Sequence, residues 1–339
     1  TMNKLTKIGV SALCGSLASF SAANAGDLSA SGSVHMTWIS LDDETVGNPI
    51  GINSGVSFSG SGELDNGWTV DLSIAHTDKN AYSNTNVTVG IPGLGDLRID
   101  QGTSGVGIDR MDDKTPTVWE EAYGWGLSSG IVNAAGSAAG AGFEFTPSGT
   151  PDGLTARLAF SPSVGGSNNS EKGSSGDDAS VSKSGWDLTL DASSDFTGVD
   201  GLNIYAGIAS VEQHQNAAAY NGDKEDRVVG ASYAMGSFTF GYQWSKIDLG
   251  RATGATQYEN DGYGITFNVN DDLSLGYNHY ESVQSNSTNN TAEATSFQIA
   301  YTMGGATISI ADGSVDNKNY STAAANDRDA TVISVQLAF

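Results

Sequence analysis

Apolar and polar residues alternate along nearly the whole chain after residue 25. The segment 28–38 places Leu28, Val34 and Trp38 on one face and mostly serine on the other. A period of two is typical of a β-strand with one apolar and one polar face, because successive side chains point to opposite sides of a sheet. No stretch in this region approaches the roughly 18 apolar residues of a transmembrane helix. The pattern therefore predicts an all-β chain.

Two kinds of connection separate these segments. Short turns such as 65–67 and 236–237 alternate with long polar connections such as 163–184 and 312–329. Tight turns at one end and long loops at the other are typical of a transmembrane antiparallel β-barrel. We expect sixteen strands, which begin near residues 28, 55, 68, 86, 96, 138, 154, 185, 202, 227, 238, 262, 273, 295, 306 and 331.

The charged residues favour this barrel over a soluble sandwich, whose strands would also alternate. A barrel of sixteen strands is too wide for side chains to fill, so its polar face is expected to line water and to contribute no apolar core. The charges that we find within the strands all lie on the polar face: Glu63, Asp71, Arg98, Asp100, Arg157, Asp187 and Asp191.

Composition agrees with a barrel that has a wet interior. Glycine supplies 44 of 339 residues, and only 16% of residues are charged, which is low for an ordinary soluble domain. Lys and Arg number 15 against 39 Asp and Glu, which gives a formal charge of −24. Such an acidic chain is a poor partner for nucleic acid.

The N-terminal segment has the features of a secretory signal peptide. Lys4 and Lys7 precede a mostly apolar run over residues 8–20, and Ala23 and Ala25 place small residues where a signal peptidase cleaves. We expect removal of residues 1–25, which leaves a β-barrel domain over 26–339. The only cysteine, Cys14, would leave with the signal, so no disulfide or thiolate chemistry is expected in the exported chain.

Three motifs point to a family. The segment 331–339 ends in Phe339 and has apolar residues at every second position before it, among them Val335 and Leu337; the segments 59–70 and 95–101 supply the others. Together they resemble the general diffusion porins of Gram-negative outer membranes, and the likeness covers residues 26–339. It implies a homotrimer in outer-membrane lipid and lipopolysaccharide that passes small hydrophilic solutes and ions. It also implies that Val335, Leu337 and Phe339 are the signal for the barrel-assembly machinery.

The resemblance further implies a loop folded into the barrel at about residues 102–137. Alternation at 123–127 leaves an extra strand pair open, although we favour the loop. The compact acidic motif of the family is replaced here by a looser run over 109–113. The candidates for the acidic side of the constriction are Asp109, Asp112, Asp113, Glu120 and Glu121, and those for the basic side are Arg98, Arg110 and Arg157.

Acidic loop residues that face basic wall residues would create a transverse field, and the charge lining a pore sets its ion selectivity. Because basic residues are few, we predict a preference for cations. A solute-specific channel and a non-conducting adhesion or surface barrel remain alternatives. Small inward residues argue against a plugged barrel. A hydrolase is disfavoured, because His76 and His279 lie on the apolar face and far apart in the predicted strand order.

No cofactor is expected. Acidic clusters in the predicted external loops, at 42–44, 177–178 and 223–226, offer carboxylate oxygens that could bind Ca²⁺ weakly. None has the spacing of an EF-hand, so solvated loop acids are the favoured interpretation.

Overall fold

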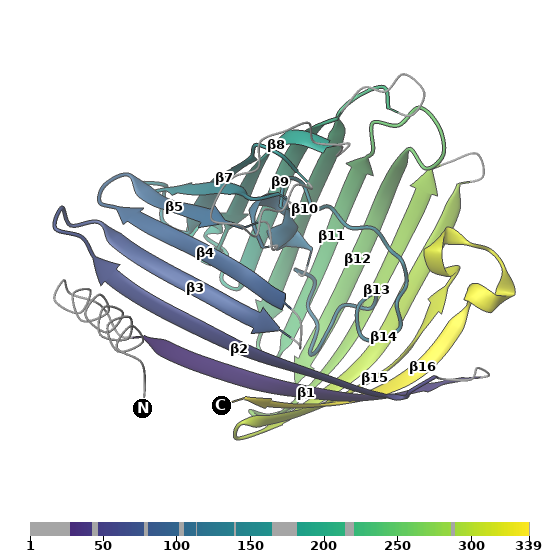
Figure 1. Cartoon of the computed structure of the whole chain (residues 1–339). Coiled ribbons are helices and arrows are strands. Elements are labelled where there is room, and N and C mark those ends of the chain that lie inside the picture. Colours follow the sequence, from purple (N-terminus) through teal and green to yellow (C-terminus); the bar gives the residue numbers. More distant parts are fainter. Residues whose placement is uncertain are drawn as a thin grey trace, which may run out of the picture.

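The computed structural model describes residues 28–42, 47–77, 81–101, 105–112, 114–138, 140–164, 182–213, 220–285 and 289–338. The expected signal peptide, Asp113 and Phe339 lie outside these ranges. Sixteen antiparallel strands form a closed barrel, in which every strand pairs with its sequence neighbours and β1 pairs with β16 (Figure 1). The predicted fold class and strand number are confirmed.

The first eight strands, which include the shortest, are β1 (Ser29–Leu41), β2 (Ile50–Glu63), β3 (Thr69–Thr77), β4 (Ala81–Ile91), β5 (Gly95–Asp100), β6 (Gly142–Pro147), β7 (Leu154–Ser161) and β8 (Ser182–Ala192). The second eight are β9 (Leu202–Gln213), β10 (Lys224–Met235), β11 (Phe238–Asp248), β12 (Gln257–Asn268), β13 (Leu273–Ser285), β14 (Asn290–Met303), β15 (Ala306–Asp316) and β16 (Arg328–Ala338).

Among the residues that the structure describes, helical structure is confined to single turns. These are α2 (Ser194–Thr197) and the 3₁₀ turns η1 (Gly107–Met111), η2 (Lys318–Tyr320) and η3 (Ala324–Asn326). Within the described ranges, no helix is long and apolar enough to cross a membrane.

The two faces of the wall differ as the alternation predicts. On β8, Trp186, Leu188 and Leu190 point outward and are 38–43% exposed, whereas Asp187 and Thr189 point inward and are fully buried. The pairing registers carry the same alternation from strand to strand around the barrel. The seven strand charges predicted on the polar face all lie on the inward side.

Most strands that descend from long loops begin earlier than predicted, whereas β6 begins at Gly142, later than the predicted start near 138. β12 begins at Gln257 rather than near 262, and β14 begins at Asn290 rather than near 295. The added residues are polar on the outward face, where Glu259, Asp261 and Glu293 lie, so the apolar outward face that marks a strand of this wall is lost there. The ladder of backbone hydrogen bonds continues all the same, because it needs no apolar side chain.

These extensions carry outward-facing charges that the pattern did not reveal. Asp261 pairs directly with Glu281, Glu281 with Glu293, and Glu293 with Asp316. Four carboxylates therefore lie side by side across β12–β15, on the outer face and toward the long-loop end. We call these four residues the outer acidic row.

Candidate pore constriction

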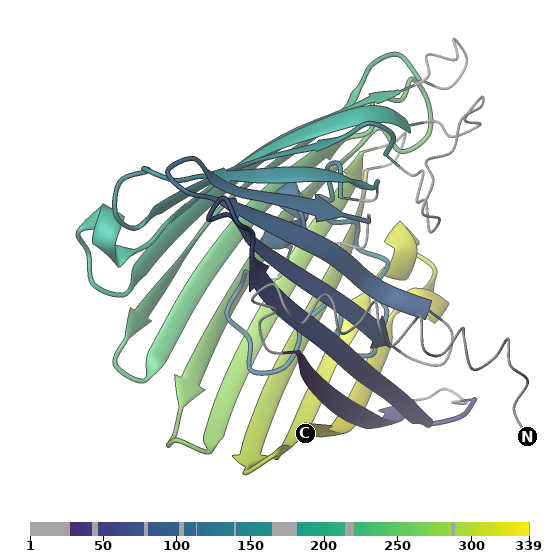
Figure 2. The ribbon, with the colours of Figure 1, turned by 60° about the vertical axis from the view of Figure 1, so that its left-hand side comes forward.

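The connection between β5 and β6 lies inside the barrel. Figure 2 shows this blue segment between strands β1–β4 in front and the green strands behind. The backbone N–H of Ala122 donates to Asn278 Oδ1 at 2.7 Å, and Asn260 Nδ2 donates to the carbonyl of Val132 at 2.9 Å. Asn278 and Asn260 are inward-facing residues of β13 and β12. The described part of this connection contains no strand, so it is a loop rather than an extra strand pair.

One buried carboxylate of the wall holds both limbs of this loop. Asp187 Oδ2 accepts the backbone N–H of Ile108, and Asp187 Oδ1 accepts that of Ser137, each at 2.9 Å. Ile108 lies near the start of the loop and Ser137 near its end. A carboxylate that accepts two buried N–H groups fixes both at once.

Two further carboxylates act in the same way. Asp226 Oδ2 accepts the N–H of Gly136 at 2.7 Å. Glu144 Oε2 accepts the N–H of Gly107 at 2.8 Å, and Glu144 also forms an ion pair with Arg110. Wall acids of β6, β8 and β10 therefore fix the loop mainly through its backbone.

Inward-facing glycines let the loop approach the wall closely. A Cβ on Gly241 would lie 2.2 Å from Pro116 Cδ, and one on Gly264 would lie 2.2 Å from the Pro116 carbonyl oxygen. Gly207 has the same relation to Ile108 and Met111, at 2.9–3.0 Å. The close fit of the loop therefore depends on missing side chains on β9, β11 and β12.

Apolar clusters fill the space between loop and wall. Ile108 and Met111 of the loop pack with Ile247 of β11, and Trp125 of the loop packs with Val332 of β16. The prediction that the inward face contributes no apolar core is therefore wrong for β9–β16. The loop covers these strands, so apolar side chains on their inner face are shielded from water.

The far limb of the loop is bound near β14 and η2. Gln298 Oε1 accepts the N–H groups of Trp119 and Glu120, at 3.1 and 3.3 Å. The Tyr320 hydroxyl accepts the N–H of Val132 at 3.1 Å. Burial raises the pKa of Tyr320 above its ordinary value, so its hydroxyl stays protonated at neutral pH.

The predicted acidic residues occupy different environments. Asp109 Oδ2 accepts the N–H of Gly105 at 2.6 Å within the loop, and Asp112 is half-buried. Glu121 is 3% exposed. Glu120 is the one exposed candidate among those described.

Each predicted basic residue is paired with a wall carboxylate. Arg98 Nη2 lies 2.6 Å from Asp100 Oδ2, and Arg157 Nη1 lies 2.6 Å from Asp191 Oδ2. Arg110 pairs with Glu144 as described above. The sequence prediction missed Lys114 on the loop, whose Nζ lies 2.9 Å from Asp191 Oδ1. Its position directly after the acidic run was the available signal.

Weak Ca²⁺ binding by the acidic clusters, the less favoured interpretation of the sequence, stays an open alternative. Among the described residues, no group of three or more His, Cys, Asp or Glu side chains could hold a metal ion. Asp226, from the cluster at 223–226, bonds with Lys224 Nζ at 2.8 Å and with the loop backbone. The clusters at 43–44 and 177–178 lie outside the described residues.

A closed sixteen-stranded wall with a loop bound inside it invites comparison with known channels. The family described as Gram-negative porin matches the chain over residues 9–339. The chain belongs to this family. A search of curated protein sequences finds no match to it.

Solved porin structures share the fold of this porin at low sequence identity. OmpF of Salmonella typhi, in a complex with daunomycin, gives a TM-score of 0.68 at 12% identity and covers 93% of this chain and 98% of its own. In-vitro folded OmpT of Vibrio cholerae gives a TM-score of 0.63 at 11% identity and covers 93% of this chain and 98% of its own. A double mutant of the Rh. blastica porin gives a TM-score of 0.60 at 16% identity and covers 92% of this chain and 100% of its own.

Family and fold make this porin an outer-membrane channel for diffusion rather than an enzyme. The positions of two histidines also argue against a hydrolase. His76 lies on β3 and His279 on β13, six strands apart around the barrel, and both point outward.

Proposed function

We propose that this porin passes small hydrophilic solutes and ions through a lumen narrowed by the loop at residues 105–141, with a preference for cations. The observation that carries the proposal is the excess of acids over bases at the loop and on the wall beside it. Every candidate base is ion-paired with a wall acid, and four further acids, Asp109, Asp112, Glu120 and Glu121, stand on a loop that lies within the lumen, where Glu120 is exposed. The charge that lines a narrow passage selects ions of opposite sign.

The geometry supports an electric field in the lumen that differs from the one expected from the sequence, in which acids on the loop face bases on the wall. Bases stand on both the loop and the wall, as Arg110 and Arg157 show, and each is matched by a wall carboxylate. The wall of β1–β4 adds inward acids, among them Asp71. The acids at the loop and the wall outnumber these bases even though Lys114 and Arg157 share Asp191, which supports a negative passage and agrees with the formal charge of −24.

Maturation and assembly form part of the proposal. Residues 1–25 are removed on export, and the barrel domain 26–339 assembles as a homotrimer among outer-membrane lipid and lipopolysaccharide. Val335 and Leu337 point outward from β16, opposite Met36 and Val34 of β1, where they would be accessible before the barrel closes. This placement supports their recognition by the barrel-assembly machinery, together with Phe339.

Reversal potentials in a planar bilayer under a KCl gradient test the cation preference. The unmodified porin should give a potential of the sign set by K⁺, and Glu120→Gln should shift it toward zero. Glu281→Gln, which removes an outward-facing acid, is the matched control and should leave it unchanged. A potential of the sign set by Cl⁻ would contradict the proposal.

A further inference from the structure

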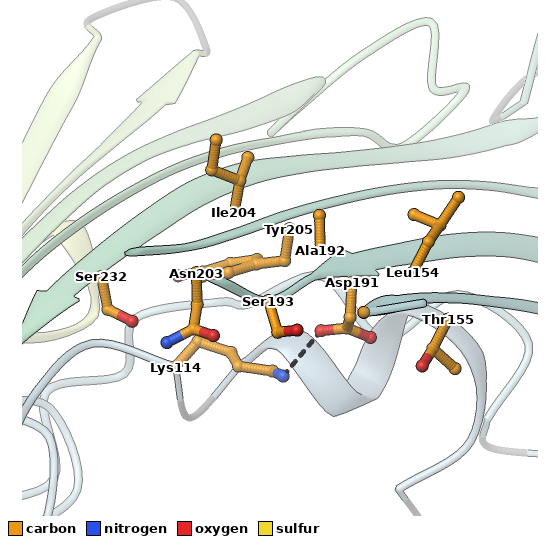
Figure 3. A pocket seen from close by; sticks show the side chains of 11 residues that line it. Lys114, Leu154, Thr155, Asp191, Ala192, Ser193, Asn203, Ile204, Tyr205 and Ser232 are labelled. Carbon is orange, nitrogen blue, oxygen red and sulfur yellow. Dashed lines mark hydrogen bonds and ion pairs between the residues drawn. The ribbon is translucent and has the colours of Figure 1, made fainter. Parts of the chain in front are cut away.

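A cavity of about 360 Å³ lies between Lys114 of the loop and the wall where β7–β10 approach their short turns (Figure 3). Figure 3 shows Thr155, Asn203 and Ser232 on the Lys114 side of the wall, whereas Ile204 and Leu154 point away. The polar side chains that line the cavity are Lys114, Thr155, Asp191, Ser193, Asn203 and Ser232.

Two cations share one carboxylate at the edge of this cavity. Asp191 is the only carboxylate among the lining residues, and it pairs with Lys114, which also lines the cavity, at 2.9 Å and with Arg157, which does not, at 2.6 Å. A lysine ammonium has three donors, so one bond to Asp191 leaves two for another acceptor. The Lys114 side chain is 35% exposed, which keeps these donors accessible.

The Lys114 ammonium is held in place from a second side. Its Nζ lies 5.5 Å from the ring centroid of Tyr205, a distance that permits a cation–π interaction. Tyr205 is itself fixed, since its hydroxyl donates to Gln243 Oε1 at 2.8 Å. Glu121 is within electrostatic reach of Tyr205, but it is buried and does not line the cavity.

The neutral lining residues suit a ligand with hydroxyl groups. Thr155, Ser193 and Ser232 can each donate or accept one hydrogen bond, and the Asn203 amide can do both. A volume of this size falls in the range of small-molecule sites. Lys114 supplies the charge and the four neutral groups supply hydrogen bonds around it.

We propose that this cavity is a binding subsite for small hydroxylated carboxylates, with Lys114 binding the carboxylate oxygen. The inference rests on the proposed function, because the solute reaches the cavity through the lumen. The inference goes beyond the proposed function because it names a class of anion that a cation-preferring channel would bind on the short-turn side of its loop.

Single-channel recording with gluconate as the probe tests the subsite. Gluconate added from the short-turn side should interrupt the KCl current of the unmodified porin, with less effect from the other side. Lys114→Gln should weaken this block about tenfold or more, because a charged hydrogen bond is lost. Lys114→Arg should retain most of it. Lys246→Gln, on the outer face of β11, is the matched control and should leave it unchanged.

A second comparison isolates the neutral groups. The double variant Thr155→Ala and Ser232→Ala should weaken block by gluconate severalfold and leave block by propionate, which has no hydroxyl groups, unchanged. Equal block of the unmodified porin and Lys114→Gln would overturn the subsite, as would equal loss in Lys246→Gln. Failure of the proposed function would appear separately, as absent conductance or chloride preference in recordings without probe.

Discussion

Two parts of the barrel wall share one alternating pattern and differ in burial. Among the described residues, none before Gly95 is buried, so β1–β4 line the lumen largely with accessible serine and asparagine, and the loop meets them only at β1, where Trp119 contacts His35. On β8–β16, inward residues such as Asp187, Asn260 and Gln298 are at most 1% exposed. The difference comes from the loop at 105–141, which is anchored to the second part. A porin interior is thus open where the loop is absent and packed like a protein core where it is present.

The comparison shows that inward polar residues have two roles. On the open wall they meet water. On the covered wall they replace water as partners for the loop backbone, as Asp187 and Asp226 do. Buried polar groups need such partners, so the same residue type carries a different energetic weight on the two walls.

The largest expected effect is the loss of the double anchor. Asp187→Ala leaves the N–H groups of Ile108 and Ser137 without their acceptor, which should cost about 2–6 kcal/mol of stability and release the loop. Thermal unfolding in detergent should occur at lower temperature, and the single-channel conductance should rise. Asp71→Ala on the open wall is the control, and an equal change there would show that the comparison is wrong.

Filling the space behind the loop should have the next largest effect. Gly264→Ala places a methyl group against Pro116, which should cost about 1–3 kcal/mol or push the loop toward β1–β4 and lower the conductance. Gly55→Ala also faces inward, but on the open wall, where its nearest contact would be Ser33 Oγ at 3.5 Å. Conductance that falls in both variants would contradict a role for close packing.

Removing the hydroxyl of Tyr320 in η2, which binds the far limb of the loop, should have a smaller effect. Tyr320→Phe takes away the acceptor of the Val132 N–H and the bond to Ser282 Oγ at 2.8 Å, which should cost about 1–2 kcal/mol. Equilibrium unfolding in denaturant measures the change. Tyr301→Phe, on the outer face of β14, should leave the stability nearly unchanged, and an equal loss there would exclude a specific role for the Tyr320 contacts.

The smallest expected effect lies outside the lumen. Glu293 stands between Glu281 and Asp316 in the outer acidic row, and directly opposed like charges destabilise a sheet. Glu293→Gln should therefore raise the free energy of unfolding by about 0.2–1 kcal/mol, which would appear as a slightly higher unfolding temperature. The gain should disappear in 1 M salt, where screening is strong. A gain that persists there would have another cause.

Most of the wall could be predicted from the sequence, because alternation is a local signal. It located sixteen strands and the inward charges. It failed at the long-loop ends of strands such as β12 and β14, where the outward face is polar and the side chains no longer indicate that the backbone is paired.

The loop contacts could be predicted only in part. Gly241 was visible on the polar face, but its close approach to Pro116 depends on a fold between segments more than a hundred residues apart. Lys114 was missed for the same reason, since its partner Asp191 lies 77 residues further along the chain. The constriction roles of Asp109, Asp112, Glu120 and Glu121 stay predictions.

The bonds of the far limb also set an order of events during folding. Glu120 binds Gln298, which lies 178 residues later, and Ala122 binds Asn278, which lies 156 residues later. These bonds cannot form until β13 and β14 have joined the sheet, and contacts between such distant residues form slowly. We expect this part of the loop to dock after those strands, so the lumen of a barrel interrupted during strand addition would be less obstructed than that of the finished one.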